Sequence, residues 1–241
     1  MGTSIIGKKE LEEEKLCEEE FSIIQKGTLI TSFNTPYSNT HGIVVDSNGN
    51  LISCDWSIDP VLGKIYIHSG ISSQTNDNFN APSVSPDGLT VDSNNNLISC
   101  DSGTGKIYIH QGISSSILTS FSSPGNDIRD LTIDNNKNLI SSDWSTGKIY
   151  IHQGISSTIN SSFNSPGTQP YGIVVNSSKN LISVDSNTNT IYIHDGISSS
   201  ILTSFSSPGG IPRGLTIDPN TENLIVVDYD DNQYKIYVVS F

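Results

Sequence analysis

The sequence is short of charge and of long apolar segments. Only 15% of its 241 residues are charged and 34% are hydrophobic, and Ser, Asn, Thr and Gly supply most of the rest. No apolar run approaches the roughly 20 residues of a membrane-spanning helix. The first residues lack the apolar region of a signal peptide, and Ile6 stands where a myristoylation signal needs Ser or Thr. We therefore expect no membrane association and a cytoplasmic protein.

Positive charge and cysteine are also scarce. The chain has 12 Lys and Arg against 25 Asp and Glu, which gives a net charge of −13. Proteins that bind nucleic acid through its phosphates need the opposite balance, so nucleic acid is not an expected partner. Three cysteines make no disulfide framework, which fits a reducing compartment.

The polar composition contains a repeat. The segment Gly-Ile-Val-Val-Asp at 42–46 returns in closely similar form at 88–92, 130–134, 172–176 and 214–218. The copies are spaced by 46 residues once and by 42 residues three times. Periods of this length are typical of propellers and solenoids.

Each repeat predicts four short strands. In the first unit these are residues 42–46, 51–55, 64–68 and a fourth strand that ends at Phe79. Polar turns such as 47–50 separate them, as in tight hairpins. The phenylalanine of the fourth strand recurs in every unit: Phe33, Phe79, Phe121, Phe163 and Phe205.

The repeats are out of phase with the chain ends. A fourth-type strand, 28–33, precedes the first unit, and the last unit ends with its third strand, 235–239. In a closed β-propeller the N-terminal strand would complete the last blade and remove an exposed sheet edge. A linear solenoid would leave this offset unexplained. The sequence therefore predicts an all-β protein, with a five-bladed β-propeller of four-stranded blades over residues 27–241.

The repeat resembles the NHL repeat, which runs Gly-Ile-x-Val-Asp, a turn, a strand ending in Asp, and a basic residue before Ile. The resemblance covers roughly residues 28–241 and implies a propeller with the first strand of each unit innermost. It implies little about chemistry, because related propellers include protein binders, RNA binders, lyases and lactonases. There are two departures: NHL propellers commonly have six blades, and this propeller is acidic, with 8 Lys and Arg against 18 Asp and Glu.

Residues 1–26 differ from the repeats. They hold seven of the eight glutamates of the chain, at positions 10, 12, 13, 14, 18, 19 and 20. Leu11, Leu16 and Phe21 form a narrow apolar stripe that predicts a short helix. Such a helix is marginal in isolation. It is either a solvated tail or a docking and oligomerisation element, and Cys17 within it has no visible partner.

Positions that are alike in every unit are expected to serve the fold. We expect Asp55 and its copies to accept hydrogen bonds from the following turn. The turn at 46–50 lacks the glutamate of a calcium loop, so a plain hairpin is expected. His68, His110, His152 and His194 end the third strands, too far apart around the axis to share one metal, and should pack between blades. Cys54 and Cys100 are expected to be small buried packing residues. The sequence thus predicts no metal site and no cofactor.

The informative positions vary within this constant frame. They precede each innermost strand (His41, Asp87, Arg129, Tyr171, Arg213) or follow the second strand of a unit (Trp56, Ser102, Trp144, Ser186, Tyr229). In a propeller both positions lie on one face, which we call the upper face, and the first set approaches the central axis.

We expect a ligand site at this face, formed by His41, Asp87, Arg129, Tyr171, Arg213, Trp56, Trp144 and Tyr229. The two arginines suit a carboxylate or phosphate, and the aromatic rings could stack on a sugar, a base or an extended peptide. The alternative is that Arg129 pairs with Asp127 or Asp130 and that the aromatic residues only cover loops.

Three functions follow. The leading hypothesis is a non-catalytic propeller that binds a protein or a small polar or anionic ligand, possibly a sugar. The second is an enzyme of the lactonase, lyase or glycosidase type, for which His41 and Asp87 are the best acid–base pair. The third is a structural module that assembles through its tail.

Overall fold

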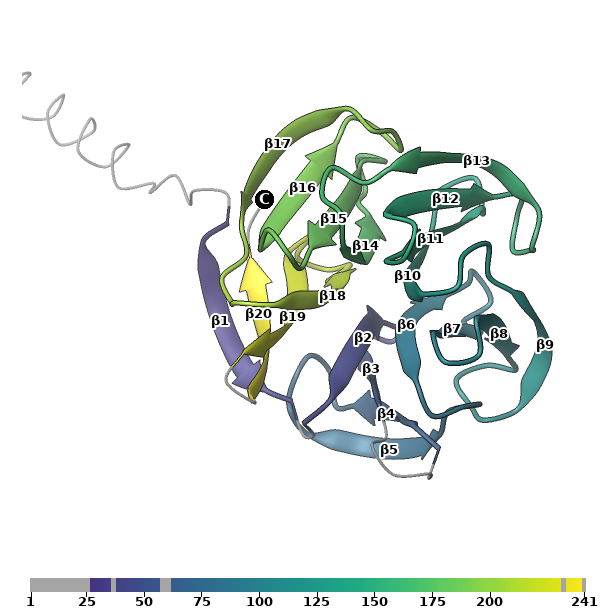
Figure 1. Ribbon diagram of the computed structural model, residues 1–241. Coiled ribbons are helices and arrows are strands. Elements are labelled where there is room, and N and C mark those ends of the chain that lie inside the picture. The colour runs from purple at the N-terminus through teal and green to yellow at the C-terminus, as the bar shows by residue number, and fades with distance from the viewer. Residues whose placement is uncertain (1–26, 36–37, 57–61, 231–232, 240–241) are drawn as a thin grey trace, which may run out of the picture.

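The computed structural model describes residues 27–35, 38–56, 62–230 and 233–239. The helix predicted within residues 1–26 lies outside them. In these residues twenty strands form five antiparallel sheets of four strands each (Figure 1). The all-β propeller is confirmed.

Each sheet is one blade. In four of the five blades the strands are arranged from the axis outward in the order in which they occur in the chain. The first two blades contain β2 (Thr40–Val45), β3 (Leu51–Asp55), β4 (Lys64–His68) and β5 (Thr75–Asn80), then β6 (Pro86–Val91), β7 (Leu97–Asp101), β8 (Lys106–His110) and β9 (Ile117–Ser122). The next two contain β10 (Ile128–Ile133), β11 (Leu139–Asp143), β12 (Lys148–His152) and β13 (Ile159–Asn164), then β14 (Pro170–Val175), β15 (Leu181–Asp185), β16 (Thr190–His194) and β17 (Ile201–Ser206).

The last blade joins the two ends of the chain. It contains β18 (Pro212–Ile217), β19 (Leu224–Asp230), β20 (Gln233–Val239) and, outermost, β1 (Leu29–Asn34). β1 is antiparallel to β20, with Leu29 opposite Val239 and Asn34 opposite Lys235. The predicted closure by the N-terminal strand is therefore present, and it gives β20 a partner on its outer side.

The core lies between neighbouring blades. Ile182 and Val184 of β15 pack with Leu215 of β18 and Val226 of β19, and Phe205 covers this cluster from the outer strand. The recurring phenylalanines occupy the same place in the other blades. In each core cluster, apolar side chains of one blade thus pack against those of the next blade.

The repeated histidines are part of this packing, as predicted. His110 is fully buried, and its ring lies 6.1 Å from that of Phe79 in the preceding blade. His110 Nε2 lies 2.9 Å from the Ser99 hydroxyl and Nδ1 lies 2.6 Å from the Ser114 carbonyl oxygen. The same pair of contacts holds His68, His152 and His194. The carbonyl oxygen requires Nδ1 to donate, and burial lowers the pKa of each ring. This favours the neutral form, in which Nε2 accepts from the serine hydroxyl.

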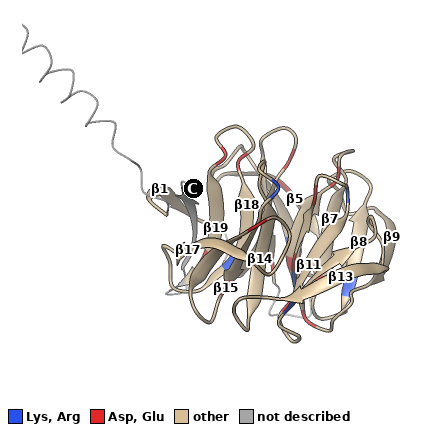
Figure 2. Ribbon diagram, turned by 90° about the horizontal axis from the view of Figure 1, so that it is seen from above, with Lys and Arg blue, Asp and Glu red and all other residues tan. Residues whose placement is uncertain are grey.

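The repeated acidic turns are hairpins, as predicted. Asp92 Oδ1 accepts backbone N–H bonds from Asn94 and Asn96, both at 2.8 Å, and Asn95 has φ of 60°. This carboxylate fixes the turn between β6 and β7. Figure 2 shows the acidic residues of the propeller mainly in loops and turns at the strand ends.

Candidate functional site

The variable positions that precede the inner strands coincide with β-bulges. In β2 the pairing moves from Thr40–Asp55 to Ile43–Ser53, so that His41 and Gly42 together face Cys54. The other four innermost strands have a register shift at the same place. A bulge redirects the extra side chain, and the five extra residues form what we call the axial ring: His41, Asp87, Arg129, Tyr171 and Arg213.

The inner strands approach closely beneath this ring. A Cβ at Gly42 would overlap the carbonyl oxygen of Asp87, and a Cβ at Gly172 would overlap that of Arg213. Glycine is therefore required at these two positions, where neighbouring strands pass the axis. The close approach also brings axial-ring residues of adjacent blades into direct contact.

Asp87 is the buried acceptor of the axial ring. Its Oδ1 lies 2.8 Å from His41 Nδ1 and 3.3 Å from Arg129 Nη1, and its side chain is 1% exposed. The carboxylate therefore links the residue of the preceding blade with that of the following one. The predicted proximity of His41 and Asp87 is present.

His41 is held as a neutral ring. Arg213 Nη1 contacts His41 Nε2, and because a guanidinium can only donate, Nε2 must be the acceptor. Nδ1 then carries the proton and donates to Asp87. Burial lowers the pKa of His41 below its ordinary value, even though Asp87 raises it. The ring also stacks on Trp56, with centroids 4.7 Å apart.

The two arginines have different partners. Arg129 contacts Asp127 at 2.7 Å and Asp87 at 3.3 Å. Burial alone would lower the pKa of Arg129, but the charges around it, chiefly Asp87, raise it. The sequence-based alternative, in which Arg129 pairs with Asp127, is therefore realised in part.

Arg213 has no carboxylate partner among the residues that the structure describes. Its polar contact is with neutral His41, and its guanidinium lies over two tyrosine rings, 4.4 Å from the centroid of Tyr229 and 5.7 Å from that of Tyr171. Such contacts stabilise a cation without neutralising it. Arg213 is thus the uncompensated positive charge of the axial ring.

The aromatic residues surround the arginines. The Arg129 guanidinium lies 4.9 Å from Tyr171, 5.8 Å from Trp144 and 5.9 Å from Trp56, measured to the ring centroids. Trp144 keeps 36% of its surface exposed. All eight predicted site residues therefore lie in one contiguous cluster, in which four aromatic rings contact the two arginines.

Unpartnered polar atoms concentrate in this cluster. Eight buried side-chain polar atoms of the described residues have no assigned hydrogen-bond partner. Half of them belong to site residues: Trp56 Nε1, Asp87 Oδ2, Arg129 Nε and Arg213 Nε. Buried polar groups are normally satisfied, and exceptions gather at functional sites.

The loops of the upper face are fixed by the repeated aspartates. Asp143 Oδ2 accepts the backbone N–H of Asp127 at 2.9 Å, and its Oδ1 accepts that of Thr146 at 2.8 Å. One carboxylate therefore ties the connection before the inner strand to the turn after the second strand. The prediction included only the second of these bonds.

Asp130 is a buried residue for which the sequence analysis assigned no central role. It stands where the other four units have glycine, and its two carboxylate oxygens accept the backbone N–H groups of Leu131 at 2.9 Å and Ile173 at 2.8 Å. Burial raises its pKa well above the ordinary value, although these N–H groups oppose the shift. Its signal in the sequence was the single break in the glycine pattern.

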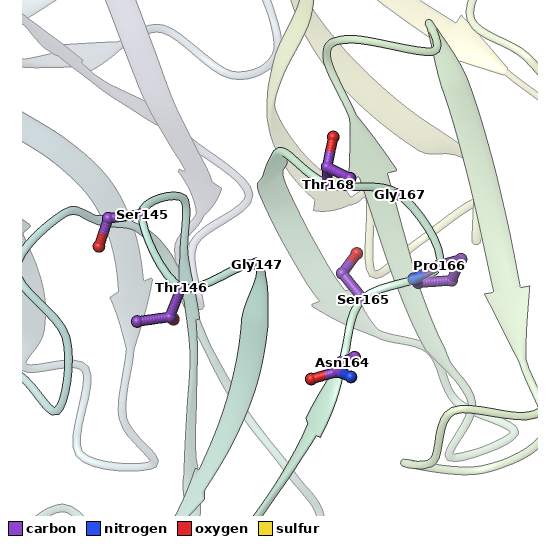
Figure 3. Close-up of a pocket in the computed structure, with 8 residues that line it drawn as sticks. All are labelled: Ser145, Thr146, Gly147, Asn164, Ser165, Pro166, Gly167 and Thr168. Carbon is purple, nitrogen blue, oxygen red and sulfur yellow. The ribbon is translucent and has the colours of Figure 1, made fainter.

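A pocket also lies on the upper face. It has a volume of about 400 Å³ and lies between the turn 145–147 and the connection 164–168 (Figure 3). Its lining is rich in hydroxyl groups, including Ser145, Thr146, Ser165 and Thr168. The turn follows Trp144 in the chain, but none of the eight site residues lines the pocket.

Both cysteines within the described residues are buried, as expected from the sequence. Cys54 and Cys100 are buried free thiols, and Cys54 Sγ lies 3.3 Å from the Asp87 carbonyl oxygen of the next blade. No group of three or more potential metal ligands occurs in the described ranges. No helix in that part of the chain is long and apolar enough to cross a membrane.

Comparison with known proteins shows the fold class. No family model and no curated sequence matches the chain, so the NHL-like pattern stands as a resemblance. Glutaminyl cyclase from Myxococcus xanthus is similar in structure, with a TM-score of 0.69 and 12% identity over 88% of this chain and 95% of the other. A luciferin-regenerating enzyme has a TM-score of 0.57 and 16% identity over 84% and 78% of the two chains.

The β-propeller domain of Doa1 is a further neighbour, with a TM-score of 0.56 and 18% identity over 80% of this chain and 61% of that one. At these identities the similarity concerns the fold alone. The chain is a β-propeller, and its neighbours include both enzymes and a WD40 domain.

Proposed function

We propose that the protein is a non-catalytic binding propeller, built from NHL-like repeats, that holds an anionic group of a partner on its upper face. The observation that carries the proposal is the uncompensated charge of Arg213. A carboxylate or phosphate would meet a cation that is already oriented by His41 and two tyrosines. The proposal needs no cofactor.

The surroundings support a ligand larger than a simple ion. Trp144 is partly exposed, and the turn that follows it in the chain lines a hydroxyl-rich pocket of about 400 Å³. An exposed aromatic ring and hydroxyl groups suit the apolar face and the hydroxyl groups of a sugar or the backbone of a peptide. The buried free thiols of Cys54 and Cys100 agree with a reducing compartment, and we keep the cytoplasm as the proposed location.

The proposal distinguishes between the two arginines. Because Arg129 is already neutralised by Asp87 and Asp127, Arg213 should supply the attraction for an anion. Replacing Arg213 by Ala removes one charge-assisted hydrogen bond, worth about 1.5–3 kcal/mol, so binding should weaken by about 10- to 100-fold. Lys137→Ala is the matched control, since it removes one positive charge from a turn on the opposite face.

A thermal-shift screen provides the test. Purified full-length protein is screened with sugars, sugar phosphates, nucleotides, small acids and divalent metals, and the hits are repeated with Arg213→Ala and Lys137→Ala. A ligand at 100 times its Kd should add about 2.7 kcal/mol to stability. We expect a hit that Arg213→Ala loses and Lys137→Ala retains. A hit that both variants retain would place the binding site elsewhere.

One contact favours the enzymatic alternative, a lactonase-, lyase- or glycosidase-like propeller. His41 and Asp87 are 2.8 Å apart, as an acid–base pair requires. However, Arg213 occupies His41 Nε2, so His41 could act as a base only after Arg213 moves. Turnover of a substrate that is lost in His41→Gln and retained in Lys137→Ala would favour the enzyme over the binding module.

A further inference from the structure

The large exposed apolar residues of the described ranges fall into two groups. Six lie on the outer strands β1, β9 and β17. The other four lie in upper-face loops of four different blades, and between 36% and 41% of each is exposed: Leu62, Val84, Trp144 and Ile211. The upper face therefore combines a centre of Trp, Tyr and Arg with apolar residues around it, a composition typical of protein interfaces.

The cations are also unevenly distributed. Of the seven Lys and Arg whose side chains the structure describes, five lie at the upper face and two, Lys137 and Lys179, lie in turns of the opposite face. The upper five are Arg129 and Arg213 of the axial ring and the first residues of three third strands, Lys64, Lys106 and Lys148. The repeated aspartates beneath them are buried and bonded to the loops. This face therefore suits an acidic, partly apolar segment.

The chain contains such a segment. Residues 1–26 hold seven glutamates, with Leu11, Leu16 and Phe21 among them. We propose, resting on the proposed binding function of the upper face, that its occupant is the acidic N-terminal segment of a second copy of this chain. Glutamates of the segment meet Arg213 and the upper lysines, and its apolar residues cover Trp144 and the neighbouring loop residues.

The test distinguishes a second copy from the chain's own segment. Glu10, Glu12, Glu13 and Glu14 lie 13 to 17 residues before Gly27, and 13 residues span up to about 45 Å when fully extended. The segment is therefore long enough to reach either upper face. Only docking on a second copy makes the mass of the protein rise with its concentration.

The two tryptophans give a direct readout. Trp56 and Trp144 are the only tryptophans of the chain, and both lie beside Arg129. The probe is a synthetic peptide of residues 1–26, which contains no Trp or Tyr, added to full-length protein under reducing conditions. We expect a saturable change in tryptophan emission as the peptide binds. The affinity for the peptide should be at least tenfold weaker in Arg213→Ala. The same peptide with its seven glutamates replaced by glutamine should leave the emission unchanged.

The oligomeric state of the full chain supplies the second arm. Sedimentation should show an increase in mass with protein concentration that high salt reverses. The triple variant Glu18→Gln, Glu19→Gln and Glu20→Gln, which changes only the segment outside the propeller, should remain monomeric over the same range. Lys137→Ala, on the opposite face, should associate like the wild type.

Three results would overturn the inference: a chain that is monomeric at every concentration, association that persists in the triple variant, or peptide binding without a change in tryptophan emission. These outcomes are separable from failure of the proposed function. A small acid whose binding is lost in Arg213→Ala, together with an inert peptide, would retain the binding site and reject only this occupant.

Discussion

At the scale of single residues, the axial ring shows how one frame carries different chemistry. Asp87 and His41 share a hydrogen bond because bulges on adjacent strands direct both side chains to the axis. The same geometry gives Arg129 two carboxylates and gives Arg213 none within the described residues. Two residues of identical type therefore have different expected roles, one structural and one in ligand binding.

Asp130 gives a prediction at this scale. Both of its oxygens accept backbone N–H groups, so Asp130→Asn would replace one acceptor by an amide donor that faces another donor. We expect a loss of about 1–3 kcal/mol of unfolding free energy, measured by urea denaturation.

The control for Asp130 is Asp134→Asn. Asp134 fixes a hairpin turn, and the equivalent residue of the next blade, Asn176, already accepts a turn N–H with its amide oxygen. This variant should therefore unfold close to the wild-type midpoint. Equal midpoints for both variants would contradict the role assigned to Asp130.

At the scale of elements, the third strands place neutral histidines inside the propeller. Burial lowers the pKa of all five histidines of the chain. In the unfolded chain their pKa is about 6.5. As the pH falls below that value the unfolded state binds protons that the folded state does not, so stability decreases.

Two buried aspartates act in the opposite direction. Burial raises the pKa of Asp55 to about 6 and raises that of Asp130 well above its ordinary value, so the folded state binds their protons first and gains stability as the pH falls toward about 4. With five histidines and two aspartates, the unfolded state binds at most three protons more than the folded state. The unfolding free energy then changes by at most about 4 kcal/mol per pH unit. Unfolding free energy should therefore decrease between pH 6.5 and 5, measured by urea denaturation across that range. An unfolding free energy that stays constant or increases as the pH falls from 6.5 to 5 would contradict burial of the histidines in their neutral form.

At the scale of the whole molecule, closure depends on the N-terminal strand. Phe33 of β1 packs against the cluster between the last and first blades, as Phe121 of β9 does between the second and third. Replacing either by Ala should cost a similar amount, up to about 3 kcal/mol, because both phenylalanines are partly buried. Comparison of the two urea midpoints tests this. If Phe33→Ala unfolds like the wild type while Phe121→Ala does not, β1 contributes little to closure.

The sequence predicted the architecture because the repeat encodes it five times. The four strands, the hairpin turns, the inter-blade histidines and the strand that completes the last blade all follow from spacing and from the phase of the repeats. The axial ring also followed, since variation inside a constant frame marks positions that the fold does not require.

The pairings within the ring could not be derived from the sequence. They depend on which bulged side chain reaches which neighbour across a blade boundary, and this fixes the Arg213–His41 contact and the division of labour between the arginines. The burial of Asp130 was missed for the same reason, because a break in a glycine pattern does not show which backbone groups the new side chain will meet.

A tryptophan-emission titration with the strongest anionic hit, run in parallel on wild type, Arg213→Ala and Lys137→Ala, tests whether the upper face is the binding site. We expect a saturable change in wild type and in Lys137→Ala, with a Kd about 10- to 100-fold weaker in Arg213→Ala. Equal affinities in all three proteins, or binding that leaves Trp56 and Trp144 unaffected, would contradict the assignment of the upper face as the binding site.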